Sequence, residues 1–456
     1  MHMDISFRLN GEDVTLRGVS PTQTVLDWLR EERGLKGTKE GCNEGDCGAC
    51  TVMVSDEDGA RALNACILFL PQLQGKALRT VEGLTGPDGE LHPVQEAMIT
   101  HHGAQCGFCT PGVVMSLAAA HGRGDPSHDD VLAGNLCRCT GYAPIIRAAE
   151  TAAKAPVPDW LKETMPAPVQ ADGTQFAPQS ADDLAKVYAQ YPEARLVAGA
   201  TDVGLWVTKG LQDLGQVIFV GRCKDLQQIE ETEAGLRIGA GVNIETLRLA
   251  MGRYPSFQEM LRRFASTQVR MAATIGGNIA NGSPIGDAPP PLIALGAILH
   301  LRQGEARREI LLEDFFIEYG KQDRRAGEFI EAITIPSNEN RLRVYKLSKR
   351  FDQDISALCG AFNIIVEDGR VAKARIAFGG MAGTPKRALA VEAALIGQPW
   401  SEAALEAVWD AWEADFQPLS DLRATAGYRM SAARGMLSRY LLEDLGMPVS
   451  VLEVEP

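Results

Sequence analysis

Eight of the ten cysteines lie within the first 140 residues, and this clustering constrains the chain more than any other feature of its sequence. The rest of the chain contains Cys223 and Cys359, which we interpret as small buried apolar side chains. In a reducing compartment, a dense cysteine set favours metal binding over disulfides. We therefore expect the N-terminal part to hold metal.

The first cysteine set spaces Cys42, Cys47 and Cys50 as C-x4-C-x2-C, and Cys66 follows after fifteen residues. This is the spacing of plant-type 2Fe–2S ferredoxins. A loop that wraps inorganic sulfide needs positive φ angles, which glycine adopts readily, and its N–H groups are expected to point at the sulfurs. The glycines of this loop are Gly41, Gly45 and Gly48. A structural zinc site is the alternative, although zinc ribbons usually pair two C-x2-C knuckles.

The second set places Cys106 and Cys109 in a C-x2-C pair, and Cys137 and Cys139 in a C-x-C pair after twenty-seven residues. Each pair directly precedes an expected helix start, at Thr110-Pro111 and at 140–144. Two helix N-termini would then direct N–H dipoles toward an anionic cluster. Zinc would explain this pattern on its own, but the neighbouring ferredoxin-type set favours a second iron–sulfur cluster.

The hydrophobic pattern predicts strands and helices on both sides of a linker that is rich in Pro and Ala and covers 153–181. The expected strands are 5–9, 14–16, 51–54, 195–197, 216–220, 236–238, 361–366 and 372–377. The expected helices are 24–32, 181–190, 245–251, 388–395, 402–415 and 420–445, and the pattern also turns helical over 92–117 and 129–153. Gly and Pro cluster at 276–291, and we expect a loop at 274–287.

Composition excludes several functions. The net charge is −14 and there is no long Lys/Arg run, which argues against nucleic acid or an anionic membrane as the main partner. No apolar run reaches the length of about 18 residues that a membrane span requires. The first residues lack the pattern of a signal peptide. A cytoplasmic location is therefore the default expectation.

Two further segments are rich in small residues. The first, 196–204, follows an expected strand and could form an anion nest for a diphosphate. The second, 274–287, has small hydroxyl and amide side chains and one acid, as nucleotide recognition requires. Neither is a Rossmann or P-loop motif, and either could be an ordinary loop.

At the cysteine motifs 39–50 and 105–112 the sequence resembles the iron–sulfur part of the xanthine dehydrogenase (molybdenum hydroxylase) family. The resemblance continues through the rest of the chain. It implies an α+β multidomain fold, with a β-grasp ferredoxin domain at 1–78 and a four-helix 2Fe–2S domain at 79–155. After a linker at 156–178 come an α+β FAD-binding domain (PCMH/VAO-like) at 179–344 and a C-terminal α+β domain of the CO dehydrogenase flavoprotein type at 345–456.

The resemblance also implies the cofactor ligands. The two clusters would be bound by Cys42, Cys47, Cys50 and Cys66, and by Cys106, Cys109, Cys137 and Cys139. FAD would be bound by Leu196, Val197, Ala198, Gly199, Ala200, Thr201, Asp202, Val203, Phe264, Ala265, Thr274, Gly277, Asn278, Ser283, Asp287, Ile330 and Lys346. From sequence alone Lys346 would be a solvated charge. The charged loop 348–354 would lie beside the flavin and affect NAD+ access, and Tyr319 is a weaker candidate for contact with NAD+.

In this family electrons would pass from a molybdopterin-binding large subunit to the helical-domain cluster, the ferredoxin-domain cluster, FAD and NAD+. The sequence shows no counterpart of the molybdopterin portion, so no catalytic residue is expected on this chain. The expected assembly is an (αβ)2 heterotetramer that oxidises hypoxanthine or xanthine. The alternatives are the equivalent subunit of another molybdenum hydroxylase, acting on an aldehyde or another heterocycle, and a zinc-stabilised scaffold without redox function. The sequence does not distinguish NAD+ from O2 as the electron acceptor.

Overall fold

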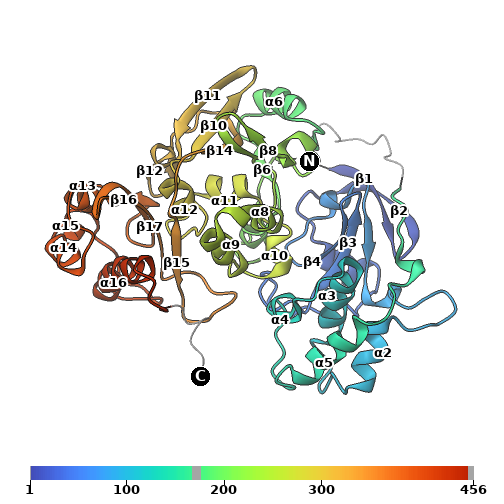
Figure 1. Ribbon diagram of the computed structural model, residues 1–456. Coiled ribbons are helices and arrows are strands. Elements are labelled where there is room, and N and C mark those ends of the chain that lie inside the picture. The colour runs from blue at the N-terminus through green and yellow to red at the C-terminus, as the bar shows by residue number, and fades with distance from the viewer. Residues whose placement is uncertain (1, 167–175, 450–456) are drawn as a thin grey trace. The chain divides into compact units, whose positions relative to one another are not determined.

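A computed structural model describes residues 2–166 and 176–449, so the central part of the predicted linker, 167–175, lies outside the described residues. Figure 1 traces the chain. It divides into two compact units. The first comprises Met1–Lys224 with Ala265–Thr274, and the second comprises Asp225–Phe264 with Ile275–Pro456.

The first unit opens with a mixed sheet in the order β2-β1-β5-β3-β4, in which β1 runs parallel to β5 and the other neighbours are antiparallel. Its strands are β1 (Met3–Leu9), β2 (Glu12–Val19), β3 (Thr51–Asp56), β4 (Gly59–Asn64) and β5 (Ala77–Arg79). The predicted strands of this region are confirmed. The helix predicted over 24–32 is confirmed over Val25–Glu32, although only α1 (Val25–Asp27) is α-helical and the chain continues as a π-helical turn, Trp28–Glu32. Trp28 packs edge-to-face on Phe7 of β1, and such tertiary packing commonly overrides helix propensity.

A set of short helices follows and shares one apolar core, which includes Val113, Leu117 and Ile145. The helices are α2 (Pro93–Thr100), α3 (Thr110–Arg123), α4 (His128–Leu132) and α5 (Ala143–Ala152). Both predicted helix starts are confirmed, since Pro111 and Pro144 occupy the first turns of α3 and α5. Met53 and Ala62 of the sheet extend into the same core, so the ferredoxin-like and helical parts pack as one body.

The remainder of the first unit contains a parallel pair of strands whose register joins Leu196 to Ile218. Its elements are α6 (Ala181–Gln190), β6 (Arg195–Val197), α7 (Val203–Thr208), β7 (Val217–Phe219) and α10 (Thr267–Arg270). The predicted helix 181–190 and strand 195–197 are confirmed at these bounds.

The second unit begins with an antiparallel sheet in the order β11-β10-β14-β9-β8. Its strands are β8 (Ile229–Thr232), β9 (Gly235–Gly239), β10 (Ile298–Gln303), β11 (Ala306–Leu311) and β14 (Phe329–Pro336), with a small hairpin of β12 (Phe316–Glu318) and β13 (Lys321–Gln322). Its helices are α8 (Ile244–Ala250), α9 (Pro255–Arg262), α11 (Ile275–Asn281) and α12 (Pro289–Ala294).

The loop expected over 274–287 is therefore partly helical, since α11 occupies part of it, and α12 begins just after it. The three prolines of α12 stand in its first turn, where the missing N–H groups have no intrahelical acceptor in any case. Proline there starts a helix rather than breaking one.

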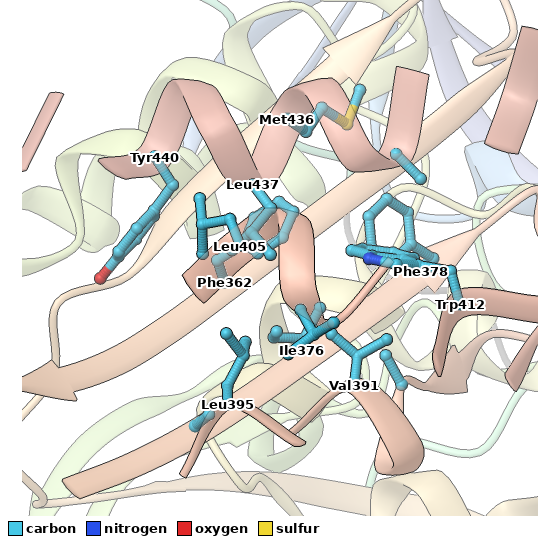
Figure 2. Packing of buried hydrophobic residues seen from close by; sticks show 14 of the residues in the cluster. Phe362, Ile376, Phe378, Val391, Leu395, Leu405, Trp412, Met436, Leu437 and Tyr440 are labelled. Carbon is cyan, nitrogen blue, oxygen red and sulfur yellow. The ribbon is translucent and has the colours of Figure 1, made fainter. Parts of the chain in front are cut away.

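The C-terminal part of the second unit packs helices on an antiparallel sheet in the order β15-β16-β17-β18. The strands are β15 (Arg343–Leu347), β16 (Leu358–Glu367), β17 (Arg370–Gly379) and β18 (Lys386–Arg387). The helices are α13 (Leu389–Leu395), α14 (Glu402–Ala407), α15 (Ala411–Asp415) and α16 (Ala426–Asp444). Figure 2 shows the core between them, where Phe362 and Phe378 of the strands meet Trp412 and Leu437 of the helices.

Two helix predictions in this part need correction. The helix predicted over 402–415 is broken between α14 and α15, and the turn buries Trp412 completely. The helix predicted over 420–445 begins at Ala426, because the Thr425 side chain caps it by accepting a hydrogen bond from the Tyr428 N–H at 3.2 Å. Short 3₁₀ turns connect the elements at Leu70–Leu73, Val81–Gly83, Asp159–Leu161, Lys224–Gln227, Met251–Arg253 and Leu312–Phe315.

Candidate cofactor sites

The first cysteine loop, 41–50, directs its backbone at sulfur atoms. The Cys42 N–H donates to the Cys47 Sγ at 3.3 Å, the Gly45 N–H to the Cys66 Sγ at 3.2 Å, and the Cys47 N–H to the Cys42 Sγ at 3.3 Å. Such hydrogen bonds stabilise the negative charge of the thiolates and help set the reduction potential of a cluster. They have the form that the sequence predicted.

The glycines of this loop serve two different purposes. Gly45 and Gly48 have positive φ angles of 78° and 67°, as predicted. Gly41 does not, so the positive φ expected there is wrong. A Cβ at Gly41 would instead lie 2.8 Å from the Cys47 Sγ, so this glycine leaves room for a sulfur atom.

The four thiols of the first set contact one another. Hydrogen bonds, first from Cys47 and next from Cys66, hold the pKa of Cys42 far below its usual value. The pKa of Cys50 is also lowered, chiefly by a hydrogen bond with Cys66. Cys50 and Cys66 are buried, whereas Cys42 and Cys47 are half-buried. The four sulfurs therefore meet in one nest that opens toward solvent on one side.

The second cysteine set lies at the ends of helices. Cys109 is the N-cap residue of α3, and Gly107 turns the chain between Cys106 and Cys109 with a φ of 80°. Burial, followed by a hydrogen bond with Cys137, raises the pKa of the Cys109 thiol to about 12. Cys137 is buried, while Cys106 and Cys139 are exposed. This set therefore reaches the protein surface.

Tyr142 shapes the second half of this site, and sequence reasoning did not single it out. It has a left-handed backbone with a φ of 67° just before α5. Its hydroxyl accepts from the Cys137 N–H at 2.8 Å and donates to the Asn135 carbonyl at 3.0 Å. The Thr140 hydroxyl lies 3.2 Å from the Cys137 Sγ. Hydrogen bonds from neighbouring residues thus fix the position of this cysteine.

The two cysteine loops touch within the first unit. The Leu136 N–H, next to Cys137, donates to the Cys47 carbonyl at 3.0 Å. A Cβ at Gly48 would lie 2.0 Å from the Gly134 carbonyl, and a Cβ at Gly112 would lie 2.2 Å from the Gly48 carbonyl. Only glycine permits backbones to approach so closely. The roles of Gly112 and Gly134 had no local sequence signal, because they depend on contacts between distant segments.

A buried amide strengthens this junction. Gln268 of α10 is 1% exposed, and its Nε2 lies 3.0 Å from the Asn135 Oδ1, 3.1 Å from the Ser116 Oγ and 3.4 Å from the Thr51 Oγ1. Thr51 directly follows Cys50, and Asn135 precedes Cys137 by two residues. One side chain from the segment 265–274 therefore binds both cysteine domains.

The first glycine-rich segment, 196–203, joins β6 to α7 and includes Ala200 in a left-handed conformation with a φ of 58°. A Cβ at Gly199 would lie 1.9 Å from the Ala272 carbonyl, so this glycine is required for backbone packing. The Gln72 side chain donates to the Ala198 carbonyl at 2.9 Å. A Cβ at Gly204 would meet Ile67, the neighbour of Cys66, at 2.9 Å. The segment thus lies against the first cysteine domain.

The second glycine-rich segment, 274–287, lies in the second unit except for its first residue, Thr274. Gly277 is exposed near the start of α11, and the Oδ1 of Asn278 is buried without a hydrogen-bond partner among the described residues. A buried acceptor without a donor is costly, and a bound group that supplies one would satisfy it. Ile330 on β14 is buried at 7% exposure, and Phe264 is half-buried.

Lys346 is not the solvated charge that its sequence context suggests. Its side chain is 2% exposed, and its Nζ lies 2.6 Å from the Asp287 Oδ2. The Ser356 hydroxyl lies 2.8 Å from the same Nζ and donates to the Asp287 Oδ1 at 2.6 Å. Burial of an ammonium group requires such pairing. The structure therefore brings together Lys346 and Asp287, two of the predicted cofactor ligands.

The charged loop 348–354 is held by Arg263. This guanidinium lies over the Phe351 ring with 4.5 Å to the centroid, and it donates to the Phe351 carbonyl at 3.1 Å and the Lys346 carbonyl at 2.9 Å. Arg263 directly precedes Phe264. Tyr319, the weaker candidate for contact with NAD+, is 76% exposed in the turn between β12 and β13.

Comparison with known proteins agrees with this arrangement. Four family models match: a 2Fe-2S iron-sulfur cluster binding domain over 7–70, a [2Fe-2S] binding domain over 80–150, the FAD binding domain in molybdopterin dehydrogenase over 171–338, and the CO dehydrogenase flavoprotein C-terminal domain over 343–444. In the residues that the structure describes, no helix combines the length and apolarity of a membrane span.

Similar curated proteins include xanthine dehydrogenase of Calliphora vicina, 32% identical over 88% of this chain, and xanthine dehydrogenase/oxidase of Gallus gallus, 31% identical over 88%. The chain spans about a third of these relatives, 36% and 37% of their lengths. Similar solved structures include a Cu,Mo-CO dehydrogenase chain, with a TM-score of 0.55 and 27% identity, and a carbon monoxide dehydrogenase chain from Hydrogenophaga pseudoflava, with 0.55 and 29%. Each match covers 58% of this chain, and 94% and 93% of those chains respectively.

These findings first define a class: the chain is an iron–sulfur flavoprotein with two 2Fe–2S binding domains and an FAD-binding domain. It belongs to the molybdenum hydroxylase family, as the iron–sulfur/FAD electron-transfer part. The predicted fold class and cofactors are thereby confirmed.

The side chains fit these cofactors. The first nest of cysteines, with N–H groups directed at sulfur, suits an iron–sulfur cluster. In the second set the Thr140 hydroxyl lies against the Cys137 sulfur, which also suits a thiolate ligand. The unpartnered Asn278 oxygen suits a nucleotide. Among residues 2–166 and 176–449, no group of three or more His, Cys, Asp or Glu side chains could hold a single metal ion.

Proposed function

We propose that this chain is the iron–sulfur/FAD subunit of a xanthine dehydrogenase, which passes electrons from a molybdopterin-binding partner subunit to NAD+. The partner would oxidise hypoxanthine or xanthine. The names of the curated relatives support this substrate class. The expected assembly is an (αβ)2 heterotetramer, and a cytoplasmic location remains our prediction.

The observation that carries the proposed order of cofactors is the position of the ferredoxin-like domain within the first unit. Its Cys47 carbonyl bonds the Leu136 N–H beside the second cysteine set, and its Gln72 bonds the glycine-rich segment at Ala198. Cys106 and Cys139 of the second set are exposed. These contacts support an order in which the first cluster would stand between the second cluster and the flavin loop, and the second cluster would face the partner subunit.

The ligands of each cofactor are proposed as the resemblance implies. The first cluster takes Cys42, Cys47, Cys50 and Cys66, and the second takes Cys106, Cys109, Cys137 and Cys139. FAD takes 196–203 for its diphosphate and adenosine side, and Phe264, Ala265, Thr274, Gly277, Asn278, Ser283, Asp287, Ile330 and Lys346 for the rest. When bound, the clusters carry single electrons and FAD exchanges a pair with NAD+.

The chain's own residues position these groups. The N–H groups of the first loop stabilise thiolate charge, and Tyr142 holds Cys137. Arg263 fixes the charged loop 348–354, which would border the nicotinamide entrance. The glycines at 48, 112 and 134 bring the two cysteine loops together, and tunnelling over short distances is what an electron-transfer chain requires.

A second candidate is the equivalent subunit of another molybdenum hydroxylase. This candidate is supported by the similarity to chains of CO dehydrogenase structures. The match covers those chains almost completely. Steady-state assays with the co-purified partner separate the two, because a purine substrate should reduce the flavin in the first case and not in the second.

The test of the electron path is Cys137→Ser. We expect this variant to lose the helical-domain cluster, to retain the ferredoxin-domain cluster and FAD, and to lose flavin reduction by the purine in complex with the partner. Ser438→Ala on α16 is the matched control. Normal purine-dependent flavin reduction in Cys137→Ser would overturn the proposed path. A colourless protein with stoichiometric zinc would favour a scaffold.

A further inference from the structure

Ser356 joins two buried charged groups. It is 1% exposed, accepts a hydrogen bond from the Lys346 Nζ at 2.8 Å and donates one to the Asp287 Oδ1 at 2.6 Å. The Lys346 Nζ also donates to the Asp287 Oδ2 at 2.6 Å. The three side chains thus close a ring of hydrogen bonds, in which each carboxylate oxygen has its own donor.

Neutralising charge would not by itself require the serine, because Lys346 and Asp287 already form an ion pair. What the hydroxyl adds is orientation. A hydroxyl can donate and accept at the same time, so it determines the direction of both the carboxylate and the ammonium group. Among the described residues, two of the three ammonium N–H groups have acceptors, Asp287 and Ser356. The third N–H direction is then determined by the tetrahedral geometry of the nitrogen.

The backbone around Ser356 is itself fixed. The next residue, Ala357, donates its N–H to the Leu347 carbonyl at 2.8 Å, and its carbonyl accepts from the buried guanidinium of Arg429 on α16. Arg429 also donates to the Gly380 carbonyl at 3.0 Å. The Gly380 N–H in turn donates to the Pro284 carbonyl at 2.7 Å, within the second glycine-rich segment.

We propose that Ser356 is a positioning residue for FAD, whose hydroxyl holds Asp287 and Lys346 so that the remaining ammonium N–H donates to the bound cofactor. This rests on the proposed assignment of Lys346 and Asp287 as FAD ligands. Through Ala357 and Arg429, the C-terminal helix α16 keeps Ser356 in place. The position of the Lys346 ammonium group is thus set by a residue that lies just before β16.

The test measures FAD affinity and the midpoint potential of bound FAD in the full chain. For Ser356→Ala we expect about tenfold weaker FAD binding, because a hydrogen bond to charged groups is lost. The fixed cation also favours reduced, electron-rich FAD. If reduced FAD loses tenfold more affinity than oxidised FAD, the midpoint potential falls by about 30 mV. Ser356→Thr, which keeps the hydroxyl, should restore both values.

Several outcomes would overturn the inference. Unchanged affinity and potential in Ser356→Ala would do so, and so would weaker binding with an unchanged potential, which indicates a structural role alone. Ser438→Ala on α16, in the same unit, is the control. If Ser356→Ala does not fold, Ser356→Cys, which keeps the size with a weak donor, should show the same two changes.

Two companion variants separate this inference from the assignment on which it rests. Lys346→Met and Asp287→Asn should each weaken FAD binding at least as much as Ser356→Ala. If both bind FAD normally, the assignment of these two ligands is wrong. If both lose FAD while Ser356→Ala keeps its affinity and potential, the assignment stands and the positioning role of Ser356 is overturned.

Discussion

Acidification should destabilise the first unit through one histidine. His92 is fully buried at the start of α2, where its Nδ1 accepts a hydrogen bond from the Val94 N–H at 3.1 Å. Its Nε2 is buried without a hydrogen-bond partner in the part of the chain that the structure describes. Burial, the neighbouring His121 at 5.4 Å between ring centroids and Arg79 together lower the pKa of His92 to about 4.

The sign follows from the direction of the shift. Since the folded state keeps His92 neutral below its usual pKa of 6.5, the unfolded chain binds a proton first as the pH falls. Stability is therefore complete above pH 6.5 and is lost progressively as the pH drops toward 4. Between pH 7 and pH 5 the loss amounts to about 2 kcal/mol in the free energy of unfolding.

The assay compares melting temperatures of the unaltered protein and His92→Asn at pH 7 and pH 5, at one scan rate. Asn keeps a cap acceptor for α2 without titrating. Any packing defect of the variant is present at both pH values and cancels in the comparison. We expect the unaltered protein to lose about 4–8 °C more than His92→Asn on acidification. Equal losses would refute the reasoning.

Three further changes test the packing that supports the sites. Gly199→Ala places a Cβ 1.9 Å from the Ala272 carbonyl and should reduce FAD content, measured by absorbance, whereas Gly122→Ala, with open space around it, should not. Gln268→Leu removes the donor shared by three oxygens and should lower stability by about 1–3 kcal/mol in thermal melts. An unchanged melting temperature would contradict that role. Trp412→Ala should cost about 3–5 kcal/mol, while the partly exposed Trp409→Ala should cost much less.

Local chemistry made the cysteine sites predictable. Four thiols at a ferredoxin spacing, with glycines at 45 and 48, have few uses besides a 2Fe–2S cluster, and these two glycines have the expected positive φ. Pro111 and Pro144 mark helix starts for the same reason of local geometry. The two iron–sulfur clusters were therefore predictable from local patterns, whereas FAD and the fold class followed from the family resemblance that these motifs carry.

Long-range packing explains most of what was not predicted. The helix expected over 402–415 is broken where Trp412 is buried, and Gly41 is required by the size of a sulfur atom rather than by its φ. Lys346 looks like a surface charge until Asp287 and Ser356 are seen around it. None of these contacts leaves a pattern within a short window of sequence.

The sequence alone indicated the two iron–sulfur clusters, because cluster ligation depends on residue types at short spacings. FAD followed from the resemblance of the two glycine-rich segments to the FAD-binding loops of the family. The tertiary structure alone decided how the cofactor-bearing segments meet, through Leu136 on Cys47, Gln268 on Asn135 and Ser356 on Asp287. The partners of these three contacts are separated by 69, 89 and 133 residues. Burial removes water from such contacts, so their polar atoms must find partners that only folding supplies.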